Sequence, residues 1–571
     1  MKFPKISISR INLLFGLVSL TAFILVCQLF NLQIIKGNSY SEQADRQYTA
    51  PNHSVFSRGT IYFKDKTGQL VSAATLQTGF ILAINPQNIE DSKMVYEKIS
   101  EIVEIDAVTF FNKANKKDDP YEEIILKLDK ETADKISALD LEGVGLYKQR
   151  WRFYPGKNLS AHSLGFIGFS GDENSVEGLY GLEKYYNDSL KRKNEDLYVN
   201  FFAEVFSSVG DSFSKVRKEG DIILGIDPSV QLFLESELQN IADEWGIESG
   251  AGIIMDPKTG KIYSLAVYPS FDLNNFKDED VTTFGNPVVE NVFEMGSIIK
   301  PLTMAIGLDT GAVTADTTYD DKGFLVMDKA RISNYDGKAR GVVPMQEVLN
   351  QSLNTGVAFV VNKVGHKKFA DYMLRLGLGE ETGIDLPNET YGLVDNLHST
   401  RDIEYATASF GQGIALTPIE TVRALATLAN GGVMVTPHLA TDIKYRTGIT
   451  RELIYEPGER IFKENTSDEI TRMLVKVVDD ALVGGTLKLE NYSIAAKTGT
   501  AQIAKENGKG YYEDKYLHSF FGYFPAYDPE FIVFFYIVNP REVKYASQTL
   551  TDPFMETAKF LINYYEIPPD R

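Results

Sequence analysis

One uninterrupted apolar run near the N-terminus constrains this chain more than any other feature. Residues 11–35 contain no charged side chain and include LLFGLVSLTAFILVCQLF. Roughly 20 helical residues, at about 1.5 Å each, cross the core of a bilayer, so the run is long enough to span it. A cleaved signal peptide would have an apolar region of about 7–15 residues and a small-x-small cleavage site, and no good site of this kind follows. The run therefore predicts a single transmembrane anchor.

The charges on either side of this run predict its orientation. Lys2, Lys5 and Arg10 precede it, whereas Lys36 stands alone directly after it. Positive residues close to a membrane span favour the cytoplasmic side. We therefore expect residues 1–10 to form a cytoplasmic tail and the rest of the chain, beyond the anchor, to lie outside the cytoplasm.

The exported part has to be stable without disulfides, and its composition excludes several classes of function. Cys27 is the only cysteine and lies within the apolar run. The net charge is −20, from 78 acidic and 58 basic side chains with no long basic block, which argues against nucleic acid as a partner. The six histidines are scattered, and neither His-Glu-x-x-His nor a phosphate-binding Gly-x-x-x-x-Gly-Lys-Ser/Thr sequence occurs. We expect no metal and no cofactor.

The sequence changes in character before the middle of the chain. The first part mixes amphipathic helical segments with short strand-like ones and shows no cluster of catalytic residues. The polar stretch at residues 213–221 then leads into SGAGIIMDPKTGKIYSLAVYP, which is typical of two apolar strands around a turn. Strand-like segments return near the C-terminus after a long helical region. We predict one domain at residues 36–220 and another at residues 221–571, in which distant strands form a sheet covered by helices.

The tripeptide Lys-Thr-Gly occurs three times, and turn chemistry explains two of the copies. Lys66–Gly68 and Lys258–Gly260 each follow an acidic residue and join two apolar segments. The copy at Lys497–Gly499 instead comes directly after an apolar strand and continues with Thr500. A strand of this kind can line a cleft that another backbone approaches closely. We therefore expect the third copy to be the functional one.

Ser297 and Lys300 supply a nucleophile and a base at helical spacing. They open the apolar segment SIIKPLTMAIGL. Residues three apart lie on one face of a helix, so the amine can reach the hydroxyl. A lysine can take the proton of a serine if burial or a neighbouring positive charge lowers the pKa of the amine. The same spacing at Ser212–Lys215 lies in a charged stretch with no apolar helix behind it, and we expect no function there.

A third element, Ser-x-Asn, occurs once, at Ser352 and Asn354. Alone it would be typical of a helix cap. Ser297, Ser352 and Lys497 follow one another at intervals of 55 and 145 residues, all within the second predicted domain. This set of Ser-x-x-Lys, Ser-x-Asn and Lys-Thr-Gly is the one that penicillin-binding proteins and class A β-lactamases use. The chain resembles a class B penicillin-binding protein, a peptidoglycan D,D-transpeptidase, and it is more similar to the division-specific branch.

The resemblance extends over nearly the whole chain. It includes RGTIYFKDKTGQLV after the apolar run, GLYGLEKYYND in the first domain, and FGQGIALTPIE and LHSFFGYFPAYDPEF in the second. Two departures from the family pattern lie close to the nucleophile. Met295 stands where a proline often precedes Gly-Ser, and Asn286-Pro287 stands where Asn-Arg is usual.

The resemblance implies a role for each motif residue. Lys300 would take the proton of Ser297, which would attack the penultimate D-alanine of a stem pentapeptide and form an acyl-enzyme. Ser352 would pass the proton to the leaving D-alanine, and Asn354 would orient Lys300 and the donor peptide. Lys497 would meet the terminal carboxylate. The amine of a neighbouring acceptor stem would then complete the cross-link, and β-lactam antibiotics would acylate the same serine.

Residues around the third motif are expected to bind the substrate. They are Thr498, Gly499 and Thr500. The two threonine hydroxyls would join Lys497 at the carboxylate. The backbone N–H groups of Ser297 and Thr500 would form the oxyanion hole.

The resemblance also implies a fold class and partners. We expect an α+β protein with a single N-terminal transmembrane helix, an elongated mixed α/β pedestal of the dimerisation type, and a transpeptidase domain. That last domain would have an antiparallel sheet with helices on both faces and an all-helical subdomain. The protein would lie in the bacterial cytoplasmic (inner) membrane with its catalytic domain outside. Because no glycosyltransferase motif is evident, a membrane glycan polymerase of the shape, elongation, division and sporulation family would supply the glycan strands.

Other functions stay open at this point. The nearest alternative is an elongation-specific transpeptidase of the same class. A β-lactam sensor or hydrolase on the same fold is another, although no Glu-x-x-Leu-Asn sequence, which could activate deacylating water, lies between Asn354 and Lys497. A non-catalytic scaffold for the cell-wall machinery is the third.

Overall fold

The computed structural model describes residues 19–23, 56–169, 176–192, 219–505 and 510–571. Residues 19–23 are helical, and the rest of the predicted anchor lies outside the described residues. Among the helices that the structure describes, none combines the length and the apolar character needed to cross a membrane. The anchor therefore stays a prediction.

The chain forms two compact units. The first contains residues 1–57 and 76–152, and the second contains residues 58–75 and 153–571. The three motifs therefore belong to one unit. The predicted boundary at residue 221 lies within the second unit in this division, and as a boundary between domains it stays a prediction.

In the first unit, helices and strands surround a small apolar core. Its elements are β2 (Leu70–Ile84), α3 (Ser92–Ser100), α4 (Ala107–Ala114), β3 (Glu122–Leu128), α5 (Lys130–Ser137) and β4 (Val144–Phe153), of which β2 and β4 continue into the second unit. Strands β3 and β4 both pair with β2. Each helix begins after an aspartate whose carboxylate accepts hydrogen bonds from backbone N–H groups of the first turn. These caps are Asp91, Asp106 and Asp129.

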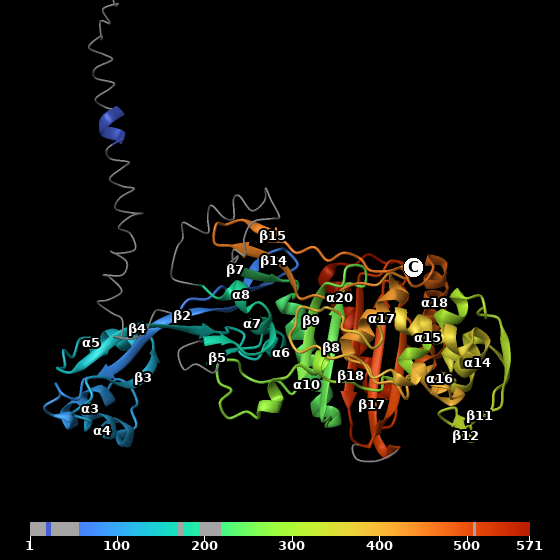
Figure 1. The fold of residues 1–571 in the computed structure, drawn as a ribbon, viewed down its shortest axis with the longest axis horizontal. Coiled ribbons are helices and arrows are strands. Elements are labelled where there is room, and N and C mark those ends of the chain that lie inside the picture. Colours follow the sequence, from blue (N-terminus) through green and yellow to red (C-terminus); the bar gives the residue numbers. More distant parts are fainter. Residues whose placement is uncertain (1–18, 24–55, 170–175, 193–218, 506–509) are drawn as a thin grey trace, which may run out of the picture. The chain divides into compact units, whose positions relative to one another are not determined.

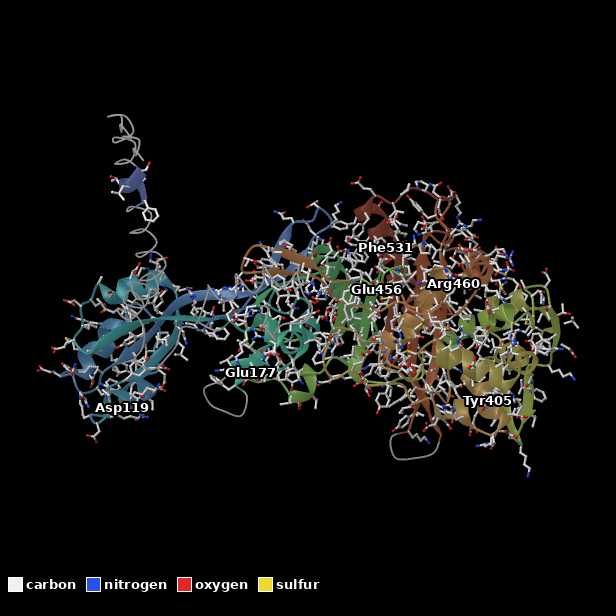
Figure 2. All side chains as sticks on the ribbon, turned by 45° about the horizontal axis from the view of Figure 1, so that its top comes forward. Asp119, Glu177, Tyr405, Glu456, Arg460 and Phe531 are labelled. Atoms are coloured by element: carbon white, nitrogen blue, oxygen red, sulfur yellow. The ribbon has the colours of Figure 1, made fainter. Side chains whose placement is uncertain are left out.

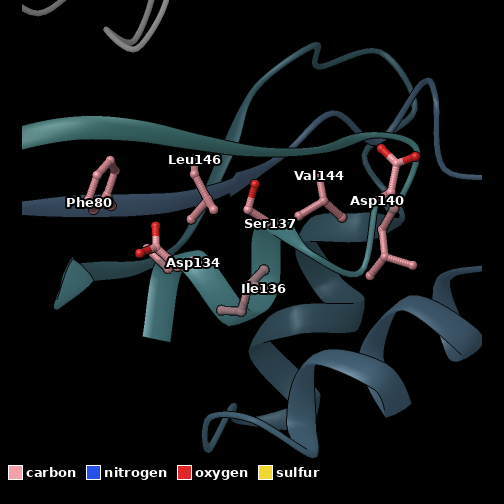
Figure 3. Close-up of a pocket in the computed structure, with 9 residues that line it drawn as sticks. Phe80, Asp134, Ile136, Ser137, Asp140, Val144 and Leu146 are labelled. Atoms are coloured by element: carbon pink, nitrogen blue, oxygen red, sulfur yellow. The ribbon is translucent and has the colours of Figure 1, made fainter. Parts of the chain in front are cut away.

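Figure 3 shows a pocket in the first unit, between α5 and strands β2 and β4. Phe80, Ile136 and Leu146 contribute apolar side chains to its lining, and Asp134 and Ser137 of α5 contribute polar groups. None of the residues of the three motifs lines this pocket.

An antiparallel sheet lies at the centre of the second unit, ordered β16-β17-β18-β8-β9. Its strands are β8 (Ser249–Met255), β9 (Ile262–Tyr268), β16 (Ala495–Ala504), β17 (Tyr511–Phe524) and β18 (Phe531–Val538). Strand β8 pairs directly with β18, nearly 300 residues later, and Figure 1 shows the green and red strands side by side. The predicted sheet of distant segments is confirmed. In the part of the chain that the structure describes, β16 lies at an edge of this sheet.

Strand β18 is apolar without interruption because helices cover both faces of the sheet. Successive side chains of a strand point to opposite faces. Phe531 (Figure 2), Val533 and Phe535 share a core with α10 (Pro228–Trp245) and α20 (Thr551–Tyr565). The residues between them, such as Ile532 and Phe534, lie in the larger core with the motif-bearing helices. Helices on both faces of the sheet, as predicted, are therefore confirmed.

Helices make up most of the regular secondary structure between β9 and β16. The principal elements there are α11 (Pro287–Glu290), η3 (Gly296–Ile299), α12 (Lys300–Asp309), α13 (Met345–Asn350), α14 (Asn354–Val364), α15 (His366–Arg375), α16 (Asp402–Ala408), α17 (Pro418–Ala429) and α18 (Glu464–Lys476). The prediction of an all-helical subdomain is wrong in one respect. Short antiparallel pairs interrupt the helices, joining β10 (Thr318–Asp321) to β13 (Gly341–Pro344) and β11 (Phe324–Met327) to β12 (Ala330–Ser333). This segment is rich in Gly and Asp turns, which break helical periodicity.

Strand β1 joins later segments of the second unit in a second sheet. Its strands include β1 (Ile61–Lys64), β7 (Gly220–Leu224), β14 (Ala440–Tyr445) and β15 (Thr450–Glu452). Between β4 and β7 the described elements are α6 (Ala161–Leu164), β5 (Ile167–Phe169), β6 (Val176–Gly178), α7 (Gly181–Tyr185) and α8 (Asn187–Leu190). Strand β1 runs parallel to β7, and β14 runs antiparallel to it.

The first two Lys-Thr-Gly copies form turns, as predicted. In each, an aspartate accepts hydrogen bonds from the turn backbone: Asp65 from the Thr67 N–H at 2.8 Å, and Asp256 from the Lys258 N–H at 2.8 Å. The glycines adopt positive φ angles of 85° at Gly68 and 83° at Gly260. Turn geometry therefore accounts for both copies.

A buried ion pair connects the segment just before β1 to α7. The Arg58 guanidinium donates from Nε to the Glu183 carboxylate at 2.5 Å and from Nη2 to the Glu183 carbonyl at 2.7 Å. Its Nη1 donates to the side chain of Asn187 at 2.9 Å. The side chains of Arg58 and Glu183 are 1% and 0% exposed. Removing either charge would leave the other buried without its partner.

We expect Glu183→Gln to lower the free energy of unfolding by about 3–5 kcal/mol, the usual cost of breaking a buried pair from one side. Urea unfolding followed by circular dichroism would measure the loss. The control is Glu556→Gln, which removes an exposed partner of Lys559 and should change stability by less than about 0.5 kcal/mol. Equal midpoints for the two variants would contradict the structural importance of the Arg58 pair.

Candidate active site

Ser297 and Lys300 lie on consecutive turns of the chain. Ser297 is in the short 3₁₀ turn η3, and Lys300 begins α12, with Pro301 in the first helical turn, where its missing N–H costs little. The backbone N–H of Lys300 donates to the Ser297 carbonyl. The Ser297 side chain is partly exposed, and no hydrogen bond joins its hydroxyl to any of the described residues. Lys300 is fully buried.

Glycines allow other segments to approach the turn that carries Ser297. Gly296 has a φ of +66°, and a Cβ there would lie 2.9 Å from the Thr500 carbonyl oxygen. A Cβ on Gly411 would lie 2.3 Å from the Gly296 carbonyl oxygen, and the Gly296 N–H donates to the Gly411 carbonyl at 3.1 Å. The FGQG segment thus holds the nucleophile turn from one side, and strand β16 lies against the other.

The third glycine of this arrangement is in the Lys-Thr-Gly motif itself. A Cβ on Gly499 would lie 2.3 Å from the Ser519 hydroxyl and 2.8 Å from the Met295 carbonyl oxygen. The Ser519 hydroxyl, on β17, donates to that same carbonyl at 2.8 Å. Gly499 is therefore required for the close packing of the nucleophile turn on the sheet. The sequence motifs predicted no role for either Ser519 or Gly411, although both lie in segments that carry the family resemblance.

Ser352 occupies an unusual backbone conformation at the end of α13. Its φ is +53°, the left-handed region, where glycine is the usual residue after a helix. The Leu353 N–H donates to the Val348 carbonyl at 2.9 Å and the Ser352 N–H to the Leu349 carbonyl at 3.3 Å, the hydrogen-bond pattern of a Schellman motif. This sharp turn separates α13 from α14 and presents both oxygens of Ser352 on one side.

Lys300 contacts Ser352 through both of those oxygens. Its Nζ donates to the Ser352 carbonyl and, at 3.0 Å, to the Ser352 Oγ. Burial is the larger cause, and the positive charge of Lys497 the smaller one, of a Lys300 pKa that lies well below its ordinary value. Among the described residues, no carboxylate forms an ion pair with this amine. The environment therefore favours the neutral amine, which can accept a proton.

Asn354 begins α14 and lies beside the strand pair. Its side-chain amide donates to the Ser333 carbonyl at 2.9 Å, at the end of β12. The segment between α12 and α13 therefore supports the Ser-x-Asn motif.

Lys497 faces the helices, whereas the two threonines of its motif face the other way. Ala495 belongs to the core that contains α12, so alternation places Lys497 and Gly499 on that side and Thr498 and Thr500 on the opposite side. Lys497 is buried, and burial lowers its pKa to about 8. Its Nζ donates to the Thr498 carbonyl at 3.0 Å.

Thr500 is the other strand residue close to the nucleophile. Its hydroxyl accepts a hydrogen bond from the Ala546 N–H at 3.0 Å, which fixes α19 (Ala546–Thr549) beside the motif. The N–H and C=O of one residue in an antiparallel strand point to the same side. Because the Thr500 carbonyl lies against Gly296, its N–H also points towards the turn that carries Ser297.

The two departures from the family pattern are accommodated locally. Pro287 occupies the first turn of α11, and the Asn286 side chain caps that helix by accepting from the Val288 N–H at 3.1 Å. Met295 is 1% exposed and packs in the larger core. Glu294, one residue earlier, accepts from the Gly413 N–H at 2.9 Å and the Tyr511 hydroxyl at 3.1 Å. Neither departure disturbs the turn at Ser297.

The described residues contain no group of His, Cys, Asp and Glu side chains that could hold a metal ion. The arrangement instead brings a serine hydroxyl, a buried amine, a second hydroxyl and a second amine into one region of the second unit. A set of this kind is suited to acyl transfer through a serine nucleophile.

Comparison with known proteins identifies two families in the chain. Residues 250–558 match the model of the penicillin binding protein transpeptidase domain. Residues 54–201 match the model of the penicillin-binding protein dimerisation domain.

Relatives and solved structures agree with this result. Stage V sporulation protein D of Bacillus subtilis is 29% identical, over 95% of this chain and 83% of the relative. Peptidoglycan D,D-transpeptidase FtsI of Escherichia coli K12 is 27% identical, over 95% of this chain and 90% of the relative. The structure of penicillin binding protein 3 from Mycobacterium tuberculosis complexed with aztreonam covers 91% of this chain and 98% of its own, with 21% identity and a TM-score of 0.68. This structural likeness shows the fold.

The transpeptidase model alone spans residues 250–558 of 571, more than half of the protein, and the dimerisation model precedes it. The chain therefore belongs to the penicillin-binding protein transpeptidase family, as a class B member.

Proposed function

We propose that this protein is a peptidoglycan D,D-transpeptidase that cross-links stem peptides through an acyl-enzyme on Ser297 and releases D-alanine. The observation that carries the proposal is the contact of a fully buried Lys300 with both oxygens of Ser352, next to the Ser297 turn. The names of the relatives, peptidoglycan D,D-transpeptidases among them, support the same reaction.

In the first half-reaction, neutral Lys300 takes the proton of Ser297. The serine oxygen attacks the carbonyl carbon of the penultimate D-alanine, and the bond from that carbon to the terminal D-alanine nitrogen breaks. The N–H groups of Ser297 and Thr500 stabilise the negative charge that develops on the carbonyl oxygen. The proton passes from Lys300 through the Ser352 hydroxyl, 3.0 Å away, to the leaving amine.

In the second half-reaction, the amine of an acceptor stem peptide attacks the ester carbon and displaces Ser297. The proton that the amine loses returns through Ser352 and Lys300 to the Ser297 oxygen. Asn354 orients the donor peptide at the Ser-x-Asn turn. Protonated Lys497 attracts the carboxylate that the uncleaved peptide carries, with the Thr498 and Thr500 hydroxyls beside it. A peptide that lies along the edge of β16 can reach side chains on both faces of that strand. Gly499 allows this edge to pack close to the turn that carries Ser297.

The cellular setting forms part of the proposal. The apolar run would anchor the protein in the bacterial cytoplasmic membrane with the catalytic unit outside. A membrane glycan polymerase of the shape, elongation, division and sporulation family would supply the strands that this protein cross-links. The names of the FtsI and sporulation relatives favour a role at the division septum over one in elongation. Depletion of the protein would produce filaments in the first case and rounded cells in the second.

The first prediction concerns the nucleophile. Intact-mass analysis of the full chain after exposure to a penicillin should show a stable adduct of one drug mass. Ser297→Ala should show none, with acylation at least about a thousandfold slower, because the variant lacks the attacking oxygen. Ser270→Ala, at an exposed serine, is the matched control and should be acylated normally.

Other outcomes would replace the proposed reaction. A folded wild-type chain that never forms the adduct would favour a non-catalytic scaffold. An adduct that forms and is released within seconds would favour a hydrolase.

The second prediction concerns pH. Lys300 must be neutral and Lys497 protonated, so the acylation rate should rise as Lys300 loses its proton and fall again above a pH of about 8, where Lys497 loses its charge. Penicillin acylation rates measured from pH 5 to 10, with circular dichroism to confirm folding, would define the two limbs. Lys258→Gln, in the turn copy of the motif, should leave the profile unchanged, whereas Lys497→Gln should remove the alkaline limb. A wild-type rate that stays constant up to pH 10 would exclude this assignment of Lys497.

A further inference from the structure

A buried carboxylate outside the three motifs is enclosed by hydrogen-bond donors. Asp321, at the end of β10, is 1% exposed. Its carboxylate accepts from the Gly323 N–H at 3.0 Å, the Arg340 N–H at 3.0 Å and the Thr355 hydroxyl at 2.8 Å. The side-chain amide of Asn334 donates to both carboxylate oxygens, at 3.0 and 3.1 Å. A buried charge is tolerated when its surroundings satisfy it in this way.

This carboxylate lies at the N-terminus of the helix that carries Asn354. Thr355, its hydroxyl donor, is the second residue of α14, and the Thr355 N–H donates to the Asn334 side chain at 3.2 Å. The first N–H groups of a helix lack partners within the helix, and its dipole favours negative charge there. Asp321 and Asn334 together therefore fix the start of α14.

The segment organised by Asp321 contacts the residues on both sides of Ser352. On the C-terminal side, the Ser333 carbonyl accepts from the Asn354 amide at 2.9 Å. On the N-terminal side, the Arg340 guanidinium donates to the Gln351 side chain at 2.9 Å. Because Asp321 holds the backbone of Arg340 and the side chain of Asn334, which is adjacent to Ser333, both contacts depend on it.

We propose that Asp321 is a positioning residue, which sets the place of the Ser352 turn relative to Lys300. The inference rests on the proposed function and deepens it. Asp321 contacts neither Lys300 nor Ser297; it acts through the residues that flank Ser352. The turn needs such support because Ser352 has a φ of +53°, a conformation that is unfavourable for a residue with a side chain.

The groups around the Ser352 turn indicate how a displacement of this turn would change the pKa of Lys300. Lys497 is the charge that acts on Lys300 from β16, and the Ser352 oxygens are its hydrogen-bond acceptors. Burial is the main cause of the lowered pKa of Lys300. A displaced Ser352 would admit water to the amine, so a higher pH would be needed to deprotonate Lys300. On the side of Asp321, the neighbouring charge is Arg340, which also pairs with Asp336.

The test compares Asp321→Asn with Asp309→Asn in the full chain. Asp309 is also a nearly buried acid that accepts from a backbone N–H and two hydroxyls, those of Lys463, Thr466 and Tyr372, but at the far end of α12. Both variants should lose stability. Asp321→Asn alone should slow penicillin acylation by about tenfold to a hundredfold at pH 7, the cost of a misplaced catalytic group, and move the acidic limb of the rate profile to higher pH.

A milder variant keeps the test decisive if Asp321→Asn does not fold. Arg340→Ala removes the contact to Gln351 from a partly exposed position, and it should shift the acidic limb in the same direction by a smaller amount. If the wild type is acylated and both Asp321→Asn and Arg340→Ala keep its pH profile of the acylation rate, the inference is overturned and the proposed function stays intact. Absence of acylation in the wild type would overturn the proposed function itself.

Discussion

The active site depends on a lysine amine that is buried without a carboxylate partner among the described residues. Burying an ammonium ion is costly, and a like charge nearby raises that cost further. Lys300 is fully buried, its nearest acceptors are the neutral oxygens of Ser352, and Lys497 acts on it with a positive charge. The structure therefore disfavours the protonated amine, which is the condition for a lysine to serve as the base of a serine.

Two parts of the second unit must pack together to bury the Lys300 amine. One is strand β16 at the edge of the central sheet, and the other is the set of helices that carries Ser297 and Ser352. Their contact is close because Gly296, Gly411 and Gly499 leave no side chain between backbones. Helices on both faces of the sheet make it rigid, so an edge strand with a buried lysine stays in place. Burial, glycine packing and sheet architecture thus all help to lower the pKa of Lys300.

Much of the second unit could be predicted because its signals are local. The apolar strands around Asp256, the turns at the first two Lys-Thr-Gly copies and the helical spacing of Ser297 and Lys300 all follow from short-range periodicity and turn chemistry. The interruption of the helical region by β10–β13 escaped prediction. Its strands are only four residues long. Strand β10 pairs with β13 about 20 residues later, which no local pattern reveals.

The sequence by itself determined the chemistry: which hydroxyls and amines are available, their order along the chain, and the helical spacing that puts Lys300 one turn from Ser297. It also determined the glycines at which backbones can meet. Only the tertiary structure decided that the amine is buried, that its partners are the two oxygens of a left-handed serine, and that Asp321 supports that turn. The reason is physical. Reactivity depends on residue type, but the pKa of a base and the position of its partner depend on solvent exclusion and on contacts between segments distant in the chain.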